Sequence, residues 1–228
     1  MADGVRLLST LALQGALIRL AGQFETATGI RIAADFAPTV GLLPRLRGGE
    51  PADLVILTRE GIDELAEEGR VVADSRIDLA RSYVGVAVVS RAPHPDIATA
   101  GALRTTLLAA RSVAYSRIGA SGIFFAQLIA QLGVAAEINA KATIVPAGFT
   151  AERLITGEAD LAIQQISELK QVAGIEVVGP IPLELQTPGL FSAGIMAEAK
   201  RRSEAERLLR FLASPEVASV LRETGLEP

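Results

Sequence analysis

Short apolar segments with the spacing of strands alternate along the chain with longer segments that have the spacing of helices. The first strand is predicted at residues 5–8, a helix continues through Phe24 and stops at Gly29, and a second strand follows at 30–36. Such alternation is typical of sheets that are covered by helices on both faces. The predicted fold class is therefore α/β, with mixed, mostly parallel sheets.

Two helix starts are predicted near the C-terminus. Ser203, with Glu206 three residues later, has the spacing of a capping box. Ser214 followed by Pro215 indicates a second N-cap with proline in the first turn, and Gly225 predicts the end of that helix.

The composition changes at two places, a β-rich run at 83–89 and a stretch rich in proline and glycine at 179–189. The 228 residues are enough for two lobes of about 100 residues each. A chain that leaves its first lobe, builds a second and returns would use both places as crossings. We therefore predict lobe one at 1–82 and 190–228 and lobe two at 83–189, with a ligand cleft between them.

Composition excludes several classes of function. There is no cysteine, which rules out disulfides and thiolate chemistry, and the single histidine rules out an imidazole-rich metal site. The net charge of −4 argues against nucleic-acid binding. Phosphate-binding and dinucleotide-binding glycine motifs are absent, as is the serine elbow of hydrolases. We expect neither a metal nor a cofactor.

The apolar stretch at 7–18 needs a separate interpretation. It is shorter than the roughly 20 residues that cross a bilayer, so no membrane insertion is expected. Asp3 replaces the basic start of an export signal, and the apolar spacing continues to Phe24, which favours a folded helix. We expect a cytoplasmic protein if Met1 is the native start, and a periplasmic one if an export signal has been removed.

Small hydroxyl residues lie where predicted strands lead into predicted helices. The N-terminus of a helix attracts anions because its first N–H groups have no partner within the helix. Three such turns facing one cleft would bind an anion without a metal, although each hydroxyl could equally cap its own helix alone. The candidate ligand-binding residues in these turns are Ser9, Thr10, Thr39, Val40, Ser116, Ser121 and Gly122.

Nineteen of the 22 basic residues are arginines, because only three are lysines. Arginine binds carboxylates with two parallel hydrogen bonds, so Arg45, Arg117 or Arg153 could hold a polycarboxylate. Ordinary surface ion pairs explain any one of them as well. His94, between two prolines, is interpreted as a surface-loop residue.

Three segments carry a family resemblance: PADLVIL at 51–57, VAYSRIGASGIF at 113–124 and FLASPE at 211–216. They resemble type II periplasmic binding proteins, and among these the molybdate-binding branch. The resemblance covers about residues 5–228. It implies two α/β lobes that close on a ligand, with anion contacts at the Ser9/Thr10 turn and at Thr39.

One segment departs from the molybdate binders, which have a tyrosine near the end of lobe two. Here AIQQISEL at 162–169 has Gln164 and Gln165 instead, and it is similar to a subgroup that includes bacterial aconitate isomerase. We expect both glutamines to contribute amide donors to the ligand.

Two functions follow from the resemblance. In the first, the chain is a monomeric solute-binding protein for a small anion, with an ABC transporter permease as its partner. In the second, it is a cofactor-independent isomerase that moves an allylic proton of a tricarboxylate. Tyr115, Ser116 and Glu168 are the candidate bases for that reaction, and the sequence does not choose among them.

Overall fold

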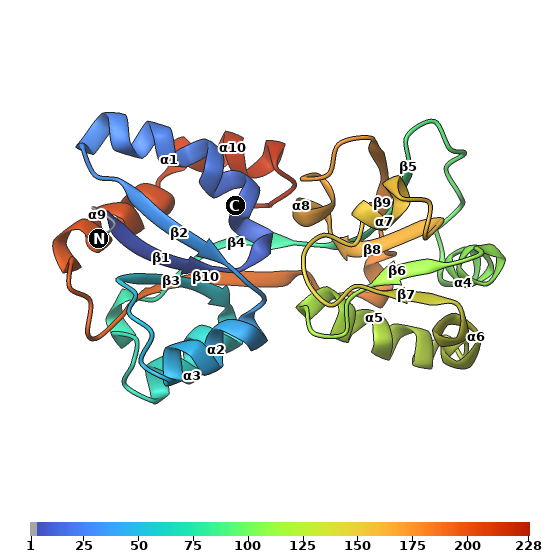
Figure 1. The fold of residues 1–228 in the computed structure, drawn as a ribbon, viewed down its shortest axis with the longest axis horizontal. Coiled ribbons are helices and arrows are strands. Elements are labelled where there is room, and N and C mark those ends of the chain that lie inside the picture. The colour runs from blue at the N-terminus through green and yellow to red at the C-terminus, as the bar shows by residue number, and fades with distance from the viewer. Residues whose placement is uncertain (1–3) are drawn as a thin grey trace. The chain divides into compact units, whose positions relative to one another are not determined.

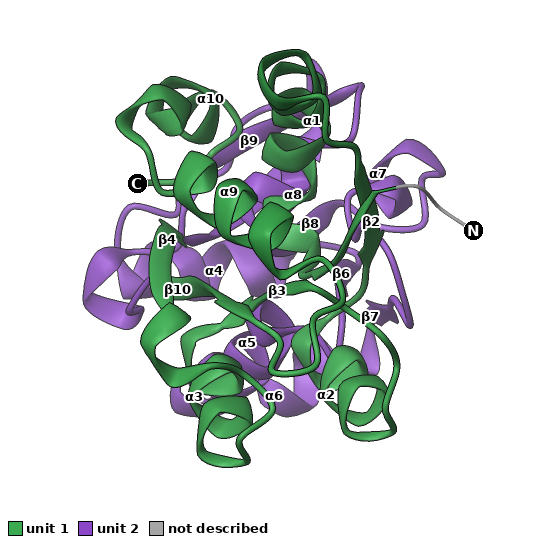
Figure 2. Cartoon of the chain, turned by 90° about the vertical axis from the view of Figure 1, so that its left-hand side faces the viewer, with its two compact units in different colours: residues 1–82, 189–228 green, residues 83–188 purple. Residues whose placement is uncertain are grey.

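The computed structural model of the chain describes residues 4–228, and their contacts divide the chain into two compact units (Figures 1 and 2). Unit 1 contains the residues up to Ser82 and those from Gly189 onward, and unit 2 contains Tyr83–Pro188. The chain thus leaves unit 1 once, builds all of unit 2, and returns.

The sheet of unit 1 has five strands in the order β2-β1-β3-β10-β4. β1 is parallel to β2 and β3, whereas β10 is antiparallel to β3 and β4. The strands are β1 (Val5–Ser9), β2 (Ile32–Phe36), β3 (Leu54–Thr58), β4 (Ile77–Ser82) and β10 (Gly189–Ile195). The helices are α1 (Gln14–Thr28), α2 (Thr39–Arg47), α3 (Arg59–Glu67), α9 (Arg202–Leu212) and α10 (Ala218–Glu223).

Helices cover both faces of this sheet. Successive side chains of a strand point to opposite faces, so Leu7 packs in one apolar cluster with α1 and α9, and Leu8 packs in another with α2 and α3. α1 buries Leu17, Leu20 and Phe24 and ends at Gly29, whose φ of 70° is the left-handed conformation that glycine adopts without strain. The predicted strand–helix–strand start of the chain is confirmed.

Unit 2 has a second five-stranded sheet, in the order β7-β6-β8-β5-β9. β6 is parallel to β7 and β8, and β5 is antiparallel to β8 and β9. The strands are β5 (Val84–Val89), β6 (Val113–Tyr115), β7 (Ala142–Ile144), β8 (Leu161–Gln165) and β9 (Ile175–Pro180). The helices are α4 (Ala100–Ala109), α5 (Ala120–Gln131), α6 (Ala135–Ala140), α7 (Glu152–Ile155) and α8 (Ile166–Leu169).

The start of α9 differs from the prediction. A capping box at Ser203 is wrong, because the helix begins at Arg202 and Ser203 lies inside its first turn. The buried carboxylate of Asp53 instead accepts the backbone N–H of Arg201 (2.9 Å) and that of Arg6 (2.9 Å). The helix start is thus fixed by a residue about 150 positions away along the chain.

The other predicted helix start near the C-terminus is confirmed in position, with Ser214 as the N-cap residue, but the Ser214 hydroxyl makes no capping hydrogen bond within residues 4–228. Pro215 opens the 3₁₀ turn Pro215–Val217, which leads into α10, and Gly225 follows that helix with a φ of 88°. The apolar stretch at 7–18 forms the end of β1, the 3₁₀ turn Leu11–Leu13 and the start of α1. Within residues 4–228, no helix combines the length and the apolar character that a membrane span requires.

Candidate functional site

The carboxyl ends of β1, β2 and β3 lie together at one edge of the unit 1 sheet. Ser9 is in register with Phe36 on one side and with Ile56 on the other. The residues that follow these strands, Thr10 after β1 and Thr39 after β2, therefore lie at the same edge. The parallel pairing brings together two of the three hydroxyl turns that the sequence singled out.

Ser9 and Thr10 have different hydrogen bonding. The Ser9 hydroxyl donates to the carbonyl oxygen of Thr10 (3.1 Å), so its proton is used within the turn. Thr10 is 4% exposed, and its hydroxyl has no hydrogen-bond partner among residues 4–228. A buried hydroxyl without a partner costs free energy, so this group is the one at the turn that a bound acceptor would satisfy.

Thr39 begins α2 with its hydroxyl oriented by the neighbouring strand. Its oxygen accepts the backbone N–H of Thr58 (3.1 Å), which leaves the hydroxyl proton to be donated elsewhere. Its methyl group packs on Gly61, where an added Cβ would lie 2.8 Å away. Because the first bonds of α2 run from Gly41 and Leu42 to the carbonyl of Pro38, the N–H groups of Thr39 and Val40 have no acceptor within the helix.

Unit 2 has a comparable edge where β6, β7 and β8 end. Ala114 of β6 is in register with Thr143 of β7 and Ala162 of β8, so these strands end side by side. Ser116 follows β6, and its oxygen accepts the N–H of Ile118 (3.3 Å), which again leaves a hydroxyl proton to donate. The turn after Ser116 leads directly into α5.

The first turn of α5 differs in one detail from the expectation. The N–H of Gly122 is not a free donor, because it donates to the carbonyl of Gly119 (3.0 Å). The N–H groups without an acceptor in the helix are those of Ala120 and Ser121. Gly122 contributes through its missing side chain instead, since an added Cβ would lie 1.5 Å from the carbonyl oxygen of Ser116.

Gln164 and Gln165 are both buried, at 4% and 3% exposure, and they point to opposite faces of β8. The Gln164 amide oxygen accepts the N–H (2.7 Å) and the hydroxyl (3.0 Å) of Thr150, and its amide nitrogen donates to the carbonyl of Gly148 (3.2 Å). The same amide also hydrogen-bonds to the carboxyl of Glu168. Gln164 thus holds the loop after β7, while Gln165 lies on the face covered by α5.

Glu168 is a buried carboxyl group on α8. Burial raises the pKa of its carboxyl to about 8, because the loss of hydration outweighs the hydrogen bonds from the Gln164 amide and the Gln165 backbone. The group is therefore protonated at neutral pH.

The other candidate bases and cations are placed differently. Tyr115 is 1% exposed and belongs to the core, with its hydroxyl donating to Asn139 (2.6 Å). Arg45 is bound by Asp35 and Glu50, and it lowers the pKa of the Glu50 carboxyl to about 2. By contrast, the exposed Arg117, next to Ser116, forms no hydrogen bond or ion pair with other residues of the described chain.

Two more of the candidate residues from the sequence form ion pairs within unit 2. Arg153 pairs with Glu158 (3.1 Å). His94 bonds to Glu176 (2.9 Å) in an exposed loop. Neither side chain is placed with the hydroxyl turns.

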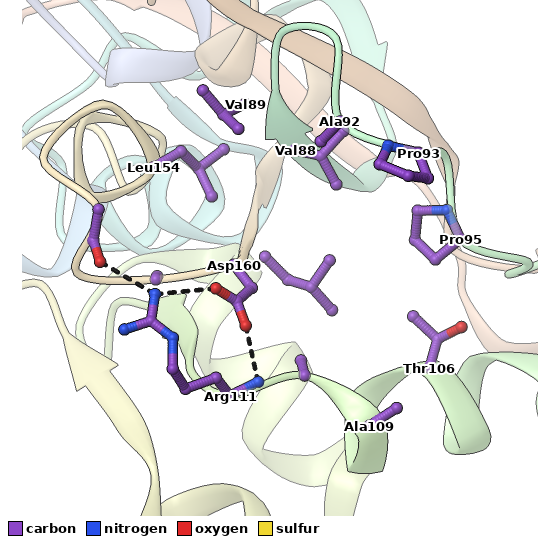
Figure 3. A pocket seen from close by; sticks show the side chains of 14 residues that line it. Val88, Val89, Ala92, Pro93, Pro95, Thr106, Ala109, Arg111, Leu154 and Asp160 are labelled. Atoms are coloured by element: carbon purple, nitrogen blue, oxygen red, sulfur yellow. Dashed lines mark hydrogen bonds and ion pairs between the residues drawn. The ribbon is translucent and has the colours of Figure 1, made fainter.

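A cavity of about 510 Å³ lies at the other end of the unit 2 sheet (Figure 3). Its wall includes Arg111 and Asp160, which precede β6 and β8 and pair with each other across 2.9 Å. Figure 3 shows the prolines of the loop after β5 on the opposite wall. None of the candidate site residues lines this cavity.

The sequence reasoning missed the residues that orient the candidate donors. Thr58 and Gly61 fix Thr39, and Thr150 fixes Gln164. No spacing signal marks these pairs, because the partners come from different strands and loops. Among residues 4–228, no group of three or more histidine, aspartate or glutamate side chains is arranged to hold a metal ion.

Comparison with known proteins gives concordant results. A family model described as bacterial extracellular solute-binding protein matches residues 5–227. Aconitate isomerase from a Pseudomonas species is 37% identical over 227 residues, with 97% of this chain and 86% of that protein covered. The molybdate-binding protein ModA of Azotobacter vinelandii is 26% identical, with 90% and 82% covered.

Solved structures agree on the fold. The periplasmic molybdate-binding protein of Azotobacter vinelandii superposes with a TM-score of 0.83 at 19% identity, covering 98% of this chain and 99% of that one. The two-lobe fold of periplasmic binding proteins that the sequence predicted is confirmed.

Proposed function

The chain belongs to the family of bacterial extracellular solute-binding proteins, and on this basis we propose that it binds a small multivalent anion, either an oxyanion or an organic polycarboxylate. The ligand contacts in this proposal are the hydroxyl turns of both units together with Gln165.

One observation carries the proposal. In each unit a hydroxyl group at the carboxyl edge of the sheet accepts a backbone N–H, Thr39 from Thr58 and Ser116 from Ile118. One lone pair of each hydroxyl is used in this way, and its proton stays available for donation to a ligand. Donors of this kind, next to helix N-termini, favour a ligand that only accepts hydrogen bonds and carries negative charge.

The relatives support the same class of ligand. The names of the similar proteins refer to molybdate and to aconitate, one a compact oxyanion and the other a tricarboxylate. Arg117 adjoins Ser116 and has no partner among residues 4–228, which favours a ligand with a carboxylate that extends beyond the hydroxyl turns. In this proposal the protein acts outside the cytoplasm as a monomer and delivers the anion to an ABC transporter permease.

A thermal-shift screen tests the binding function. Molybdate, sulfate, citrate, cis-aconitate and trans-aconitate are added separately at millimolar concentration. A micromolar binder gains about 4 kcal/mol of stability at a thousandfold excess over its Kd, so the melting temperature rises clearly. No shift with any of these anions would contradict the proposal.

A second candidate function is a proton shift within a tricarboxylate, catalysed as in aconitate isomerase. Two observations favour it, the 37% identity to that enzyme and a buried carboxyl on α8 with a pKa near neutrality. Such a group can give and take a proton at working pH. Incubation with cis-aconitate, followed by NMR for the trans isomer, tests this function. Absence of turnover leaves the binding function.

A further inference from the structure

The Glu168 carboxyl is buried in unit 2 and is bound by neutral groups. It accepts hydrogen bonds from the Gln164 amide and from the Gln165 backbone, and burial opposes its ionisation. A carboxylate buried without a cationic partner is costly, and proteins avoid that cost by keeping the group protonated. A chain that uses this position only for packing would have no need of a carboxyl group.

The Gln164 amide connects Glu168 to the loop after β7, and its orientation is fixed. The Thr150 N–H can only donate, so the amide atom facing it is the oxygen, and the nitrogen must face Gly148 and Glu168. All the hydrogen-bonding capacity of this amide is then used within the protein. A change of charge on Glu168 therefore acts on the Gly148–Thr150 loop through one side chain.

Within residues 4–228, no charged side chain contributes to the shift of the Glu168 pKa. β5 and β8, which pack against α8, carry no ionisable side chain, and on β9 Glu176 is bound by His94 and Arg91. The other ionisable residues of the surrounding elements are Glu152 and Arg153 on α7, Tyr83 before β5 and the exposed Lys170 after α8. None of them contributes to the shift of the Glu168 pKa, which burial and the two glutamines account for.

The hydrogen bonds among Glu168, Gln164 and the loop after β7 form a network that lies beside the Ser116 turn of unit 2. Ala162 of β8 is in register with Ala114 of β6, two residues before Ser116, and the Val145 N–H at the start of the loop after β7 donates to the carbonyl of Tyr115 (3.0 Å). The loop held by Gln164 therefore adjoins the strand end that leads into Ser116, and a charge on Glu168 acts on that turn through Gln164 and this loop.

We propose that Glu168 is a positioning residue that keeps its proton while an anion is bound at the Ser116 turn, and that its ionisation weakens the binding of that anion. The inference rests on the proposed function. Linkage between two binding events is reciprocal. If the proton on Glu168 raises the affinity for the anion by a certain factor, the bound anion must raise the affinity of Glu168 for its proton by the same factor. Binding near the pKa of the group is then accompanied by proton uptake.

Isothermal titration calorimetry measures this uptake directly. Molybdate and cis-aconitate are titrated into the full chain at about pH 8, in two buffers of different ionisation enthalpy. Wild type and the control Glu184→Gln, which changes an exposed glutamate, should take up as much as about half a proton per anion. Glu168→Gln, which keeps the shape of the side chain, should take up none, and its affinity should not fall between about pH 7 and about pH 9.

The possible failures are distinguishable. Binding with equal proton uptake in wild type and Glu168→Gln overturns this inference alone. No binding of any of the five anions of the thermal-shift screen overturns the proposed function and this inference with it. Carbon-13 NMR of the glutamate carboxyls in the ligand-free wild type adds a test that does not depend on any variant. A Glu168 carboxyl that titrates near its ordinary value of 4.5 also overturns the inference.

Discussion

A Cβ atom on Gly122 would lie 1.5 Å from the carbonyl oxygen of Ser116. No side chain can be accommodated at that distance, so the first turn of α5 rests directly on the backbone of the donor turn. This close approach places the N-terminus of α5 beside the Ser116 hydroxyl.

Gly122→Ala should therefore displace the Ser116 turn and abolish or greatly weaken anion binding. Overpacking of this kind also costs about 1–3 kcal/mol of stability. Calorimetric titration with the anion of largest thermal shift, together with urea unfolding, measures both effects. The control is Gly22→Ala, because nothing lies within 4 Å of a Cβ at that exposed position of α1. The control should keep its affinity and gain up to about 1 kcal/mol from helix propensity. Normal affinity in Gly122→Ala would contradict this account of the turn.

Thr39→Val tests whether the Thr39 hydroxyl of unit 1 binds the ligand. Valine keeps the methyl contact with Gly61 but removes the hydroxyl that accepts the Thr58 N–H and that is proposed to donate to the ligand. Loss of one hydrogen bond to a charged ligand costs about 1.5–3 kcal/mol, so the Kd should rise at least about tenfold. Thr105→Val is the matched control, because that hydroxyl donates to the Gly101 carbonyl on α4 (3.0 Å). Equal Kd values for the two variants would place the site elsewhere in unit 1.

The strand ends could be predicted from the sequence, whereas the orientation of the side chains at them could not. Apolar periodicity located β1 and β2, so the hydroxyl turns at Ser9 and Thr39 followed from local pattern alone. Parallel pairing then brings the turns of each unit to one edge, which the fold class already implies.

Contacts with residues far away in the sequence determine the side-chain orientations that the local pattern did not predict. Gln164 was expected to offer its amide N–H groups to the ligand, and in the structure its amide nitrogen donates to the Gly148 carbonyl (3.2 Å). That contact depends on how the loop after β7 folds back on β8, and nothing local encodes it. The same is true of Asp53, which replaces the predicted capping box of α9.

Arg117→Gln distinguishes a polycarboxylate from a compact oxyanion. Arg117 adjoins Ser116 and forms no bond with other residues of the described chain, so its loss removes charge without breaking an internal contact. The Kd for citrate or cis-aconitate should rise about tenfold, whereas that for molybdate should change less. The control Arg104→Gln removes an exposed arginine of α4, whose guanidinium donates to the Leu132 carbonyl (3.3 Å). An equal loss for all anions would mean that Arg117 acts only through the general electrostatic field.

Glu168→Gln should change how stability depends on pH. The folded pKa is raised from 4.5 to about 8, so the folded state holds a proton that the unfolded state has lost between these values. The free energy of unfolding of the wild type should therefore fall relative to the variant as pH rises through this window, by up to about 1.4 kcal/mol per pH unit. Urea unfolding at several pH values measures the difference. Parallel curves for the two proteins would show that Glu168 is ionised in the folded state.

Tyr115→Phe tests whether the Tyr115 hydroxyl has only a structural role or also transfers a proton. The Tyr115 ring packs edge-on against Phe125, with ring centroids 5.1 Å apart, and its hydroxyl donates to Asn139. Phenylalanine keeps the ring contact and loses one hydrogen bond to an exposed side chain, so the free energy of unfolding should fall by about 1 kcal/mol or less. Because Tyr115 belongs to the core beneath α5 and α6, anion affinity and any turnover of cis-aconitate should stay at the wild-type level. Loss of turnover in a variant with normal unfolding and normal affinity would instead make the Tyr115 hydroxyl the proton-transfer group.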